Sequence, residues 1–225
     1  MSFAALLFDF DGVLIESEAA GNIHLAETLT ALGHPTTPTE AMANFMGLSG
    51  PDFRAAVERW IGRPLPAAFD AARSLEDERC LHEGVSEVAG AVQFIRLLPA
   101  ELPVAVVSSS STRWLHAHLA HLGLADHFGA HVYSGSEHVA RGKPAPDIYL
   151  HAADRLGADI ERCVIIEDSP VGATGAVASG ARVIGLVAGA HCGPDHAGKL
   201  RAIGVTAIAR DFAEVARLLE RTGEW

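Results

Sequence analysis

Six short runs of apolar residues recur along this chain, and they constrain its fold more than any other feature. The runs are Ala4–Phe8, Val104–Val107, His131–Tyr133, Cys163–Ile166, Arg182–Val187 and Val205–Ile208. Each is apolar without alternation, which is typical of strands buried on both faces of a parallel sheet. Stretches with helical patterning lie between most of the runs, and they are Glu87–Leu98, Thr112–Leu122, Asp147–Leu156, Gly172–Ser179 and Phe212–Arg221. This alternation predicts an α/β fold with a doubly wound parallel sheet.

One long segment between the first and second runs interrupts the alternation. Residues 16–82 hold no convincing strand and have the pattern of several helices, separated by turns rich in Gly and Pro. An insertion of this length is too long for a loop in a compact domain. We therefore expect an α/β core of residues 1–15 and 83–225, with a small all-helical cap domain, residues 16–82, inserted after the first strand. Ligands of open α/β sheets bind at the carboxyl ends of the strands, so this insert is expected to act as a lid.

Composition restricts the partners and the surroundings of the protein. The 225 residues include 28 acidic and 17 basic side chains, which gives a net charge of −11. Such a surface repels nucleic acids and anionic membranes, so neither is an expected partner. The chain has three scattered cysteines and neither a recognisable signal peptide nor an apolar span of about 20 residues, which favours a cytoplasmic protein with reduced thiols. No apolar stripe is left over after the core is assigned, so we expect a monomer.

Two aspartates, Asp9 and Asp11, directly follow the first apolar run and precede Gly12. Side chains two residues apart in an extended segment point to the same face, with Cα atoms roughly 6.5 Å apart. Gly12 allows the backbone to turn sharply just after the pair. The alternative is a simple acidic loop, but two aspartates without a basic neighbour repel each other. The pair therefore indicates a site for a cation and for a reacting group of about phosphate size.

Polar residues also follow other predicted strands. Residues 108–112 form a Ser/Thr run after the second apolar run, and Glu167 and Asp168 follow the run that begins at Cys163. Lys143 lies in a Gly-Lys-Pro turn before the helix expected at residue 147. Taken singly, each feature has an ordinary explanation as an N-cap, a turn or a solvated strand end. Parallel strands place their carboxyl ends at one edge of a sheet, so these groups can converge.

The same residues have separate tasks in phosphoryl transfer. A carboxylate can attack phosphorus, so Asp9 is the candidate nucleophile and Asp11 the candidate acid and base, kept protonated by nearby carboxylates. Four carboxylates in one cleft need a cation, and hard oxygen ligands favour Mg²⁺. The expected phosphate donors are the Ser108 hydroxyl, the Lys143 ammonium group and the N–H groups of Ser109 and Ser110, which are expected to open a helix.

The ordered set of motifs resembles the haloacid dehalogenase-like superfamily of Mg²⁺-dependent phosphatases. The motifs are Asp9-Phe10-Asp11-Gly12-Val13, Ser108 after an apolar strand, Gly142-Lys143-Pro144 and Glu167-Asp168-Ser169-Pro170. The resemblance covers essentially the whole chain and is to the subgroup with β-phosphoglucomutase, phosphoglycolate phosphatase and sugar-phosphate phosphatases. It implies a Rossmann-like core with a helical cap. It also implies that Mg²⁺ is bound by a carboxylate oxygen of Asp9, the backbone carbonyl of Asp11 and Asp168, with Glu167 supporting the metal site.

The resemblance is looser in the cap, which sets substrate choice in this family. Residues 45–50 are similar to the family's cap loop that dips into the active site, and the expected substrate contacts are Gly47, Leu48 and Ser49. The mutases of the subgroup have a cap His near Gly21 and an Arg near Gly50. Glycine stands at both positions, which favours hydrolysis over isomerisation. Other cap residues that could face the substrate, or lie exposed on a helix, are Glu16, Asn22 and His24.

The sequence therefore predicts a Mg²⁺-dependent phosphatase that hydrolyses a small phosphorylated metabolite, such as a sugar phosphate or phosphoglycolate, through an aspartyl-phosphate. Two alternatives stay open, a phosphosugar mutase and a non-catalytic binding or regulatory protein on the same fold. The latter would be expected to lack a charged group of the site, and none is missing. Some conspicuous side chains are expected to have only structural roles: Trp60 and Trp114 in packing, and Cys192 and His196 in a Gly-rich loop.

Overall fold

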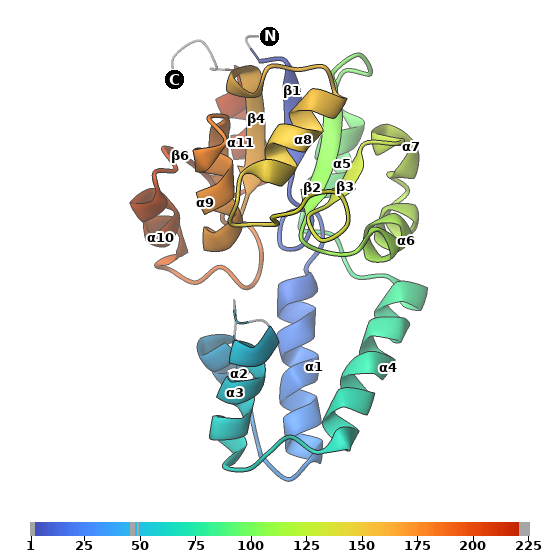
Figure 1. Ribbon diagram of the computed structural model, residues 1–225, viewed down its shortest axis with the longest axis vertical. Coiled ribbons are helices and arrows are strands. Elements are labelled where there is room, and N and C mark those ends of the chain that lie inside the picture. The colour runs from blue at the N-terminus through green and yellow to red at the C-terminus, as the bar shows by residue number, and fades with distance from the viewer. Residues whose placement is uncertain (1–2, 46–47, 49, 221–225) are drawn as a thin grey trace. The chain divides into compact units, whose positions relative to one another are not determined.

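The computed structural model describes residues 3–45, 48 and 50–220 (Figure 1). The chain divides into two compact units, one made of Met1–Glu16 with Ser86–Trp225 and the other of Ser17–Val85. Each unit has a hydrophobic core of its own. No helix in the described part of the chain combines the length and the apolar character needed to cross a bilayer.

The first unit is built on a six-stranded parallel sheet (Figure 1). Its strands are β1 Ala5–Phe8, β2 Val104–Ser108, β3 Val132–Ser134, β4 Cys163–Glu167, β5 Arg182–Leu186 and β6 Ala207–Ala209. Their order is β3-β2-β1-β4-β5-β6, so β1 pairs with both β2 and β4. The chain winds outward from β1 first to one side and then to the other, which confirms the predicted doubly wound sheet.

Both faces of this sheet are covered, which explains why its strands are apolar without alternation. The helices of the unit are α5 Ala91–Arg96, α6 Thr112–Leu122, α7 Ala125–Phe128, α8 Asp147–Arg155, α9 Pro170–Ala178, α10 His196–Ile203 and α11 Phe212–Glu220. Ala5 and Leu7 of β1 belong to one buried cluster with residues of α8 and α9. Phe8 contacts Phe94 of α5 and Phe128 of α7 edge to face. Helices on both sides therefore exclude water from the central strand.

The predicted strands begin and end within two residues of the observed ones. The predicted helix over residues 112–122 has the observed bounds, because Ser111 caps its first turn and Gly123 ends it in the left-handed conformation. Two helices were not predicted, α7 and α10. The expectation that His196 lies in a loop is wrong, since it is the first residue of α10.

The described residues of the second unit form four helices, as the sequence pattern predicted. They are α1 Ser17–Ala31, α2 Pro38–Phe45, α3 Gly50–Ile61 and α4 Ala67–Glu83. Their core includes Leu29 of α1, Phe45 of α2, Val57 of α3 and Phe69 of α4. The apolar residues of this unit therefore bury one another and form a small separate domain.

Candidate active site

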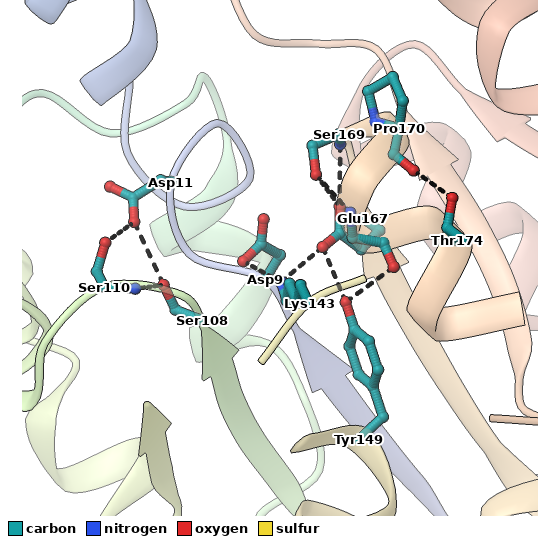
Figure 2. A network of polar contacts seen from close by, with 11 residues as sticks. Asp9, Asp11, Ser108, Ser110, Lys143, Tyr149, Glu167, Ser169, Pro170 and Thr174 are labelled. Carbon is teal, nitrogen blue, oxygen red and sulfur yellow. Dashed lines mark hydrogen bonds and ion pairs between the residues drawn. The ribbon is translucent and has the colours of Figure 1, made fainter. Parts of the chain in front are cut away.

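Asp9 follows β1 directly and extends its ladder, because its N–H donates to the carbonyl of Ile166 at 2.9 Å. This places its carboxylate beside the end of β4. Lys143, from the loop before α8, brings its ammonium nitrogen to 2.7 Å from Asp9 Oδ1 and 2.6 Å from Glu167 Oε1 (Figure 2). All three side chains are buried, at 8% exposure or less. The structure thus joins three of the predicted residues in one buried ion-pair network.

The network contains two acids, Asp9 and Glu167, but one lysine. Burial and the nearby charge of Glu167 raise the pKa of Asp9 well above its ordinary value, and Lys143 opposes them. Burial alone would lower the pKa of Lys143, but Asp9 and Glu167 outweigh it and hold that pKa well above its usual range. The protonated ammonium group of Lys143 therefore forms ion pairs with both Asp9 and Glu167.

Glu167 is held by four donors from three parts of the chain. Besides Lys143, its oxygens accept from the Tyr149 hydroxyl at 2.9 Å and from the N–H and hydroxyl of Ser169 at 2.9 and 3.1 Å (Figure 2). Burial, together with Glu167, raises the pKa of the Tyr149 phenol well above its ordinary value, so the phenol stays protonated and donates. The carboxylate also lies against Gly172, where a Cβ would come within 1.6 Å of Oε1.

Asp11 has a different set of neighbours. Its Oδ2 accepts from the hydroxyls of Ser110 at 2.6 Å and Ser108 at 3.3 Å, and its Oδ1 accepts from the indole N–H of Trp114 at 3.1 Å. Figure 2 shows Asp11 facing the two serines rather than the Lys143 network. The structure thus gives Asp11 hydroxyl and indole donors, and that nearby carboxylates keep it protonated stays a prediction.

The serine run does not open a helix in the way the sequence suggested. Helix α6 begins at Thr112, and the hydroxyl of Ser111 caps it. The N–H of Ser110 instead donates to the Ser108 hydroxyl at 3.0 Å. The prediction that the N–H groups of Ser109 and Ser110 open the helix is wrong, because both residues lie in a bend and the helix starts at Thr112.

Asp168 completes an acidic group at the carboxyl ends of β1 and β4. Ligand oxygens of Asp9, Glu167 and Asp168 lie within 4.8 Å of one another, and all three residues are buried. Asp168 is also approached from the β5–α10 segment, since His191 Nε2 lies 2.7 Å from its Oδ2 and His196 Nε2 lies 2.6 Å from its backbone oxygen. Hard carboxylate oxygens in this arrangement suit Mg²⁺.

The remaining residues named from sequence have contacts within their own units. Glu16 accepts the N–H of Ala190, Asn22 donates to the carbonyl of Glu18, and His24 lies 3.5 Å from the Thr28 hydroxyl. Leu48 is exposed, while Gly47 and Ser49 lie outside the described residues. Site residues that sequence reasoning missed are Trp114, Tyr149 and His191. Ser110 was named for its N–H group, whereas its hydroxyl is what contacts Asp11.

The doubly wound parallel sheet, with buried acids and a lysine at its carboxyl edge, makes this a Rossmann-like α/β protein with a charged site at its strand ends. The chain belongs to the haloacid dehalogenase-like hydrolase family, whose model matches residues 3–180. This confirms the family resemblance that the motifs carried.

Two relatives that match most of this chain are named as phosphatases. Over 188 residues the chain is 31% identical to hexitol phosphatase A of Escherichia coli, covering 83% of this chain and 84% of the relative. It is also 31% identical to the fructose-1-phosphate phosphatase YqaB of the same organism, covering 79% of this chain and 93% of the relative. These likenesses confirm the prediction of an enzyme of the phosphatase type.

A solved structure matches nearly the whole chain. It is a HAD family hydrolase from Deinococcus radiodurans with bound phosphate and sodium, 35% identical, with a TM-score of 0.87. The match covers 99% of this chain and 97% of that one. The architecture described above is therefore shared with that hydrolase.

Proposed function

We propose that this protein is a Mg²⁺-dependent phosphatase that hydrolyses a small sugar phosphate or a similar phosphate monoester through an aspartyl-phosphate on Asp9. The observation that carries the proposal is the Asp9 carboxylate, buried at a strand end and bound by Lys143 at 2.7 Å next to Glu167 and Asp168. The names of the hexitol and fructose-1-phosphate phosphatases support a phosphorylated sugar or polyol as substrate.

Asp9 supplies the nucleophile in this proposal. One carboxylate oxygen forms a bond to phosphorus while the bond from phosphorus to the leaving oxygen breaks. Lys143 holds the carboxylate at Oδ1, and its charge also offsets the charge of the phosphoryl oxygens. Ser108 adds a hydroxyl donor at the end of β2. We propose the neighbouring Ser109 as a further phosphate contact.

Asp11 moves the proton in both half-reactions. It gives a proton to the leaving oxygen as the first bond breaks, and in the second step it takes one from the water that attacks the aspartyl-phosphate. That attack breaks the bond between phosphorus and Asp9 and releases inorganic phosphate. The donors from Ser110 and Trp114 hold Asp11 in one orientation for these transfers.

The residues present fit a divalent cation. Asp9, Glu167 and Asp168 would carry three negative charges when ionised, and Lys143 offsets one of them. We propose Asp9, Asp168 and the backbone carbonyl of Asp11 as the ligands of Mg²⁺, with Glu167 in support because Lys143, Tyr149 and Ser169 already bind its oxygens. A bound Mg²⁺ would keep Asp9 ionised and neutralise charge on the phosphoryl group.

The helical unit, residues 17–85, is proposed to be the cap that selects the substrate and excludes water from the first step. The segment proposed to contact the substrate is Gly47, Leu48 and Ser49. Glycine at positions 21 and 50 favours hydrolysis over transfer of phosphate within a sugar.

The proposal is tested with a panel of phosphorylated sugars and polyols, with released inorganic phosphate as readout. We expect turnover by the wild-type chain and none by Asp9→Asn, which keeps the size of the side chain but not its nucleophile. Acid quenching should trap a phosphorylated protein with the wild type only. The matched control is Asp126→Asn, an exposed acid of α7, which should leave turnover unchanged.

Comparable turnover by Asp9→Asn would refute the assignment of the nucleophile. Isomerised β-glucose 1-phosphate in place of free phosphate would identify a mutase. Absence of any product across the panel would favour a non-catalytic protein.

Removal of divalent metal provides a second test. We expect EDTA to stop phosphate release and added Mg²⁺ to restore it, because the buried acids would otherwise repel one another and the phosphate. The same treatment should leave the folded state intact by circular dichroism. Undiminished activity in chelator would remove the metal from the proposal.

A further inference from the structure

The segment between β5 and α10 holds Asp168 at two points. His191 Nε2 lies 2.7 Å from Oδ2 of Asp168, and the two side chains are only 4% and 2% exposed. His196, at the start of α10, brings its Nε2 to 2.6 Å from the backbone oxygen of the same residue. A carboxylate oxygen and a carbonyl oxygen are both acceptors, so each imidazole donates to Asp168. Side chain and backbone of this acid are therefore fixed from the same segment.

The imidazole of His191 occupies a space that two glycines leave open. A Cβ on Gly189 would lie 2.5 Å from Cε1 of His191. A Cβ on Gly12, in the motif of Asp9 and Asp11, would lie 2.9 Å from the same atom and 2.2 Å from Asp168 Oδ2. Gly12 also has a φ of 84°, which favours glycine there. The ring and the carboxylate thus fit together only because both neighbouring residues lack a side chain.

Hydrogen bonds fix the loop that presents His191. The N–H of Ala190 donates to both carboxylate oxygens of Glu16, at 3.0 and 3.2 Å. The N–H of Cys192 donates to the carbonyl of Gly189 at 2.9 Å, which closes a turn around His191. These bonds fix the backbone on either side of His191 without help from Asp168.

We propose that His191 is a positioning residue for metal binding, holding the Asp168 carboxylate in the orientation that meets Mg²⁺. The inference rests on the proposed function, in which Asp168 is a metal ligand. Partners that bind and orient metal ligands are commonly worth about 10- to 100-fold in metal affinity. A ligand that is already oriented loses less conformational freedom when the cation binds.

A different use of the same residues is a site for a softer metal. Ligand atoms of His191, Cys192 and His196 lie within 4.8 Å of one another, and such a set suits Zn²⁺. The contacts favour positioning, because the Nε2 atoms of both histidines already face oxygens of Asp168. Burial and the charge of Asp168 also raise the pKa of the Cys192 thiol to about 12, so the thiolate is disfavoured.

The experiment measures metal affinity without substrate. Mg²⁺ binding to the metal-free full chain is followed by calorimetry, and Mn²⁺ binding by electron paramagnetic resonance. We expect His191→Leu, which keeps the volume but removes the donor, to bind both ions about 10- to 100-fold more weakly. His191→Gln, which retains a donor, should recover most of the affinity. Pro194→Ala, at an exposed residue of the same segment, is the matched control and should bind like the wild type.

Asp168→Asn separates this inference from the proposed function. Wild-type metal affinity in Asp168→Asn would refute the metal site itself. Loss of affinity in Asp168→Asn with full affinity in His191→Leu would overturn only the role of His191. A third outcome is tight Zn²⁺ binding that Cys192→Ser abolishes, together with unchanged Mg²⁺ affinity in His191→Leu. This outcome would overturn the positioning role of His191 in favour of a soft-metal site. His191→Leu is replaced by His191→Asn if circular dichroism shows that it does not fold. The shorter asparagine places its donor out of reach of Asp168, so the same loss of metal affinity is expected.

Discussion

Asp9 and Asp11 are two residues apart in the chain, yet their carboxylates have unlike surroundings. Asp9 is buried in an ion-pair network with Lys143, whereas Asp11 accepts hydrogen bonds from hydroxyls and an indole N–H. In the proposed mechanism, this difference separates a fixed nucleophile, Asp9, from a group that exchanges protons, Asp11. The indole belongs to Trp114, which also stacks on the buried His118 with ring centroids 4.0 Å apart. Burial lowers the pKa of His118, so a neutral ring supports the tryptophan.

Trp114→Phe tests whether the indole N–H matters for proton transfer. The ring keeps its packing but loses its donor, and a hydrogen bond to a charged group contributes about 1.5–3 kcal/mol. We expect kcat for an alkyl phosphate, whose leaving oxygen needs a proton, to fall about tenfold or more. The rate for p-nitrophenyl phosphate, whose leaving group needs no proton, should change little.

The control is Trp60→Phe, which loses a similar indole bond to the Thr36 hydroxyl, 3.0 Å away in the helical unit. It should leave both rates unchanged. Equal losses for the two substrates in Trp114→Phe would point to a general structural effect and contradict the role in proton transfer.

Prediction from sequence succeeded for where the charged residues near the strand ends lie. Asp9, Lys143, Glu167 and Asp168 meet as expected, because parallel strands end at one edge. Trp114, expected to serve packing alone, contacts Asp11 from 103 positions away. Nothing in the local pattern of α6 indicates which loop its indole reaches. Such a partner becomes visible only when helix α6 is placed against the sheet.

At the scale of elements, α9 positions the loop of Lys143. Gly175 faces this loop, and a Cβ there would lie 2.8 Å from the carbonyl oxygen of Ala145 and 3.0 Å from that of Pro144. These neighbours are backbone atoms, which cannot turn aside as a flexible side chain can. The small residues of α9 thus allow the backbone next to Lys143 to lie close to the helix.

Gly175→Ala should therefore act on stability and activity together. Overpacking costs about 1–3 kcal/mol, and relief of the clash would shift the loop that holds Lys143. We expect a lower free energy of unfolding in urea and reduced kcat.

Gly198→Ala in α10 is the matched control, since a Cβ added there would meet no other atom within 4 Å. Because alanine favours helix, this change should stabilise the protein by about 0.5–1 kcal/mol with unchanged activity. A Gly175→Ala variant as stable and active as Gly198→Ala would show that the loop adjusts freely.

Elements with clear signals at both ends were predictable, and short ones were not. The helix over residues 112–122 has a serine cap before it and a glycine after it. Helix α7 has four residues, too few for a periodic pattern, and α10 carries Gly198 in its interior. Both helices are stabilised by packing on the rest of the unit, which local sequence does not report.

At the scale of the whole molecule, each of the two units buries hydrophobic residues of its own in the described part of the chain. Leu29 is fully buried in the core of the helical unit, and Leu115 is fully buried in the unit that contains the sheet. The insertion was predicted from its length and lack of strands. Its packing partners were not, because four helices of similar composition can pair in several ways.

Leu29→Ala should destabilise one unit selectively. Loss of a buried leucine costs about 2–5 kcal/mol. By differential scanning calorimetry we expect a lower-temperature transition to separate from that of the sheet unit. Leu115→Ala should lower the other transition.

Leu75→Ala, at a leucine of α4 that is 73% exposed, is the control and should change stability by less than about 0.5 kcal/mol. One shared transition that both buried variants lower equally would show that the units unfold as one.

Gly172 lies so close to Glu167 that no larger residue fits at this position. Its missing side chain is where the Glu167 carboxylate rests, and that carboxylate is the second anchor of Lys143. A single methyl group at position 172 would displace the acid and leave the ammonium group with a looser hold. Position 172 therefore limits which related sequences can keep Lys143 in this orientation, although Gly172 has no side chain that could take part in a reaction.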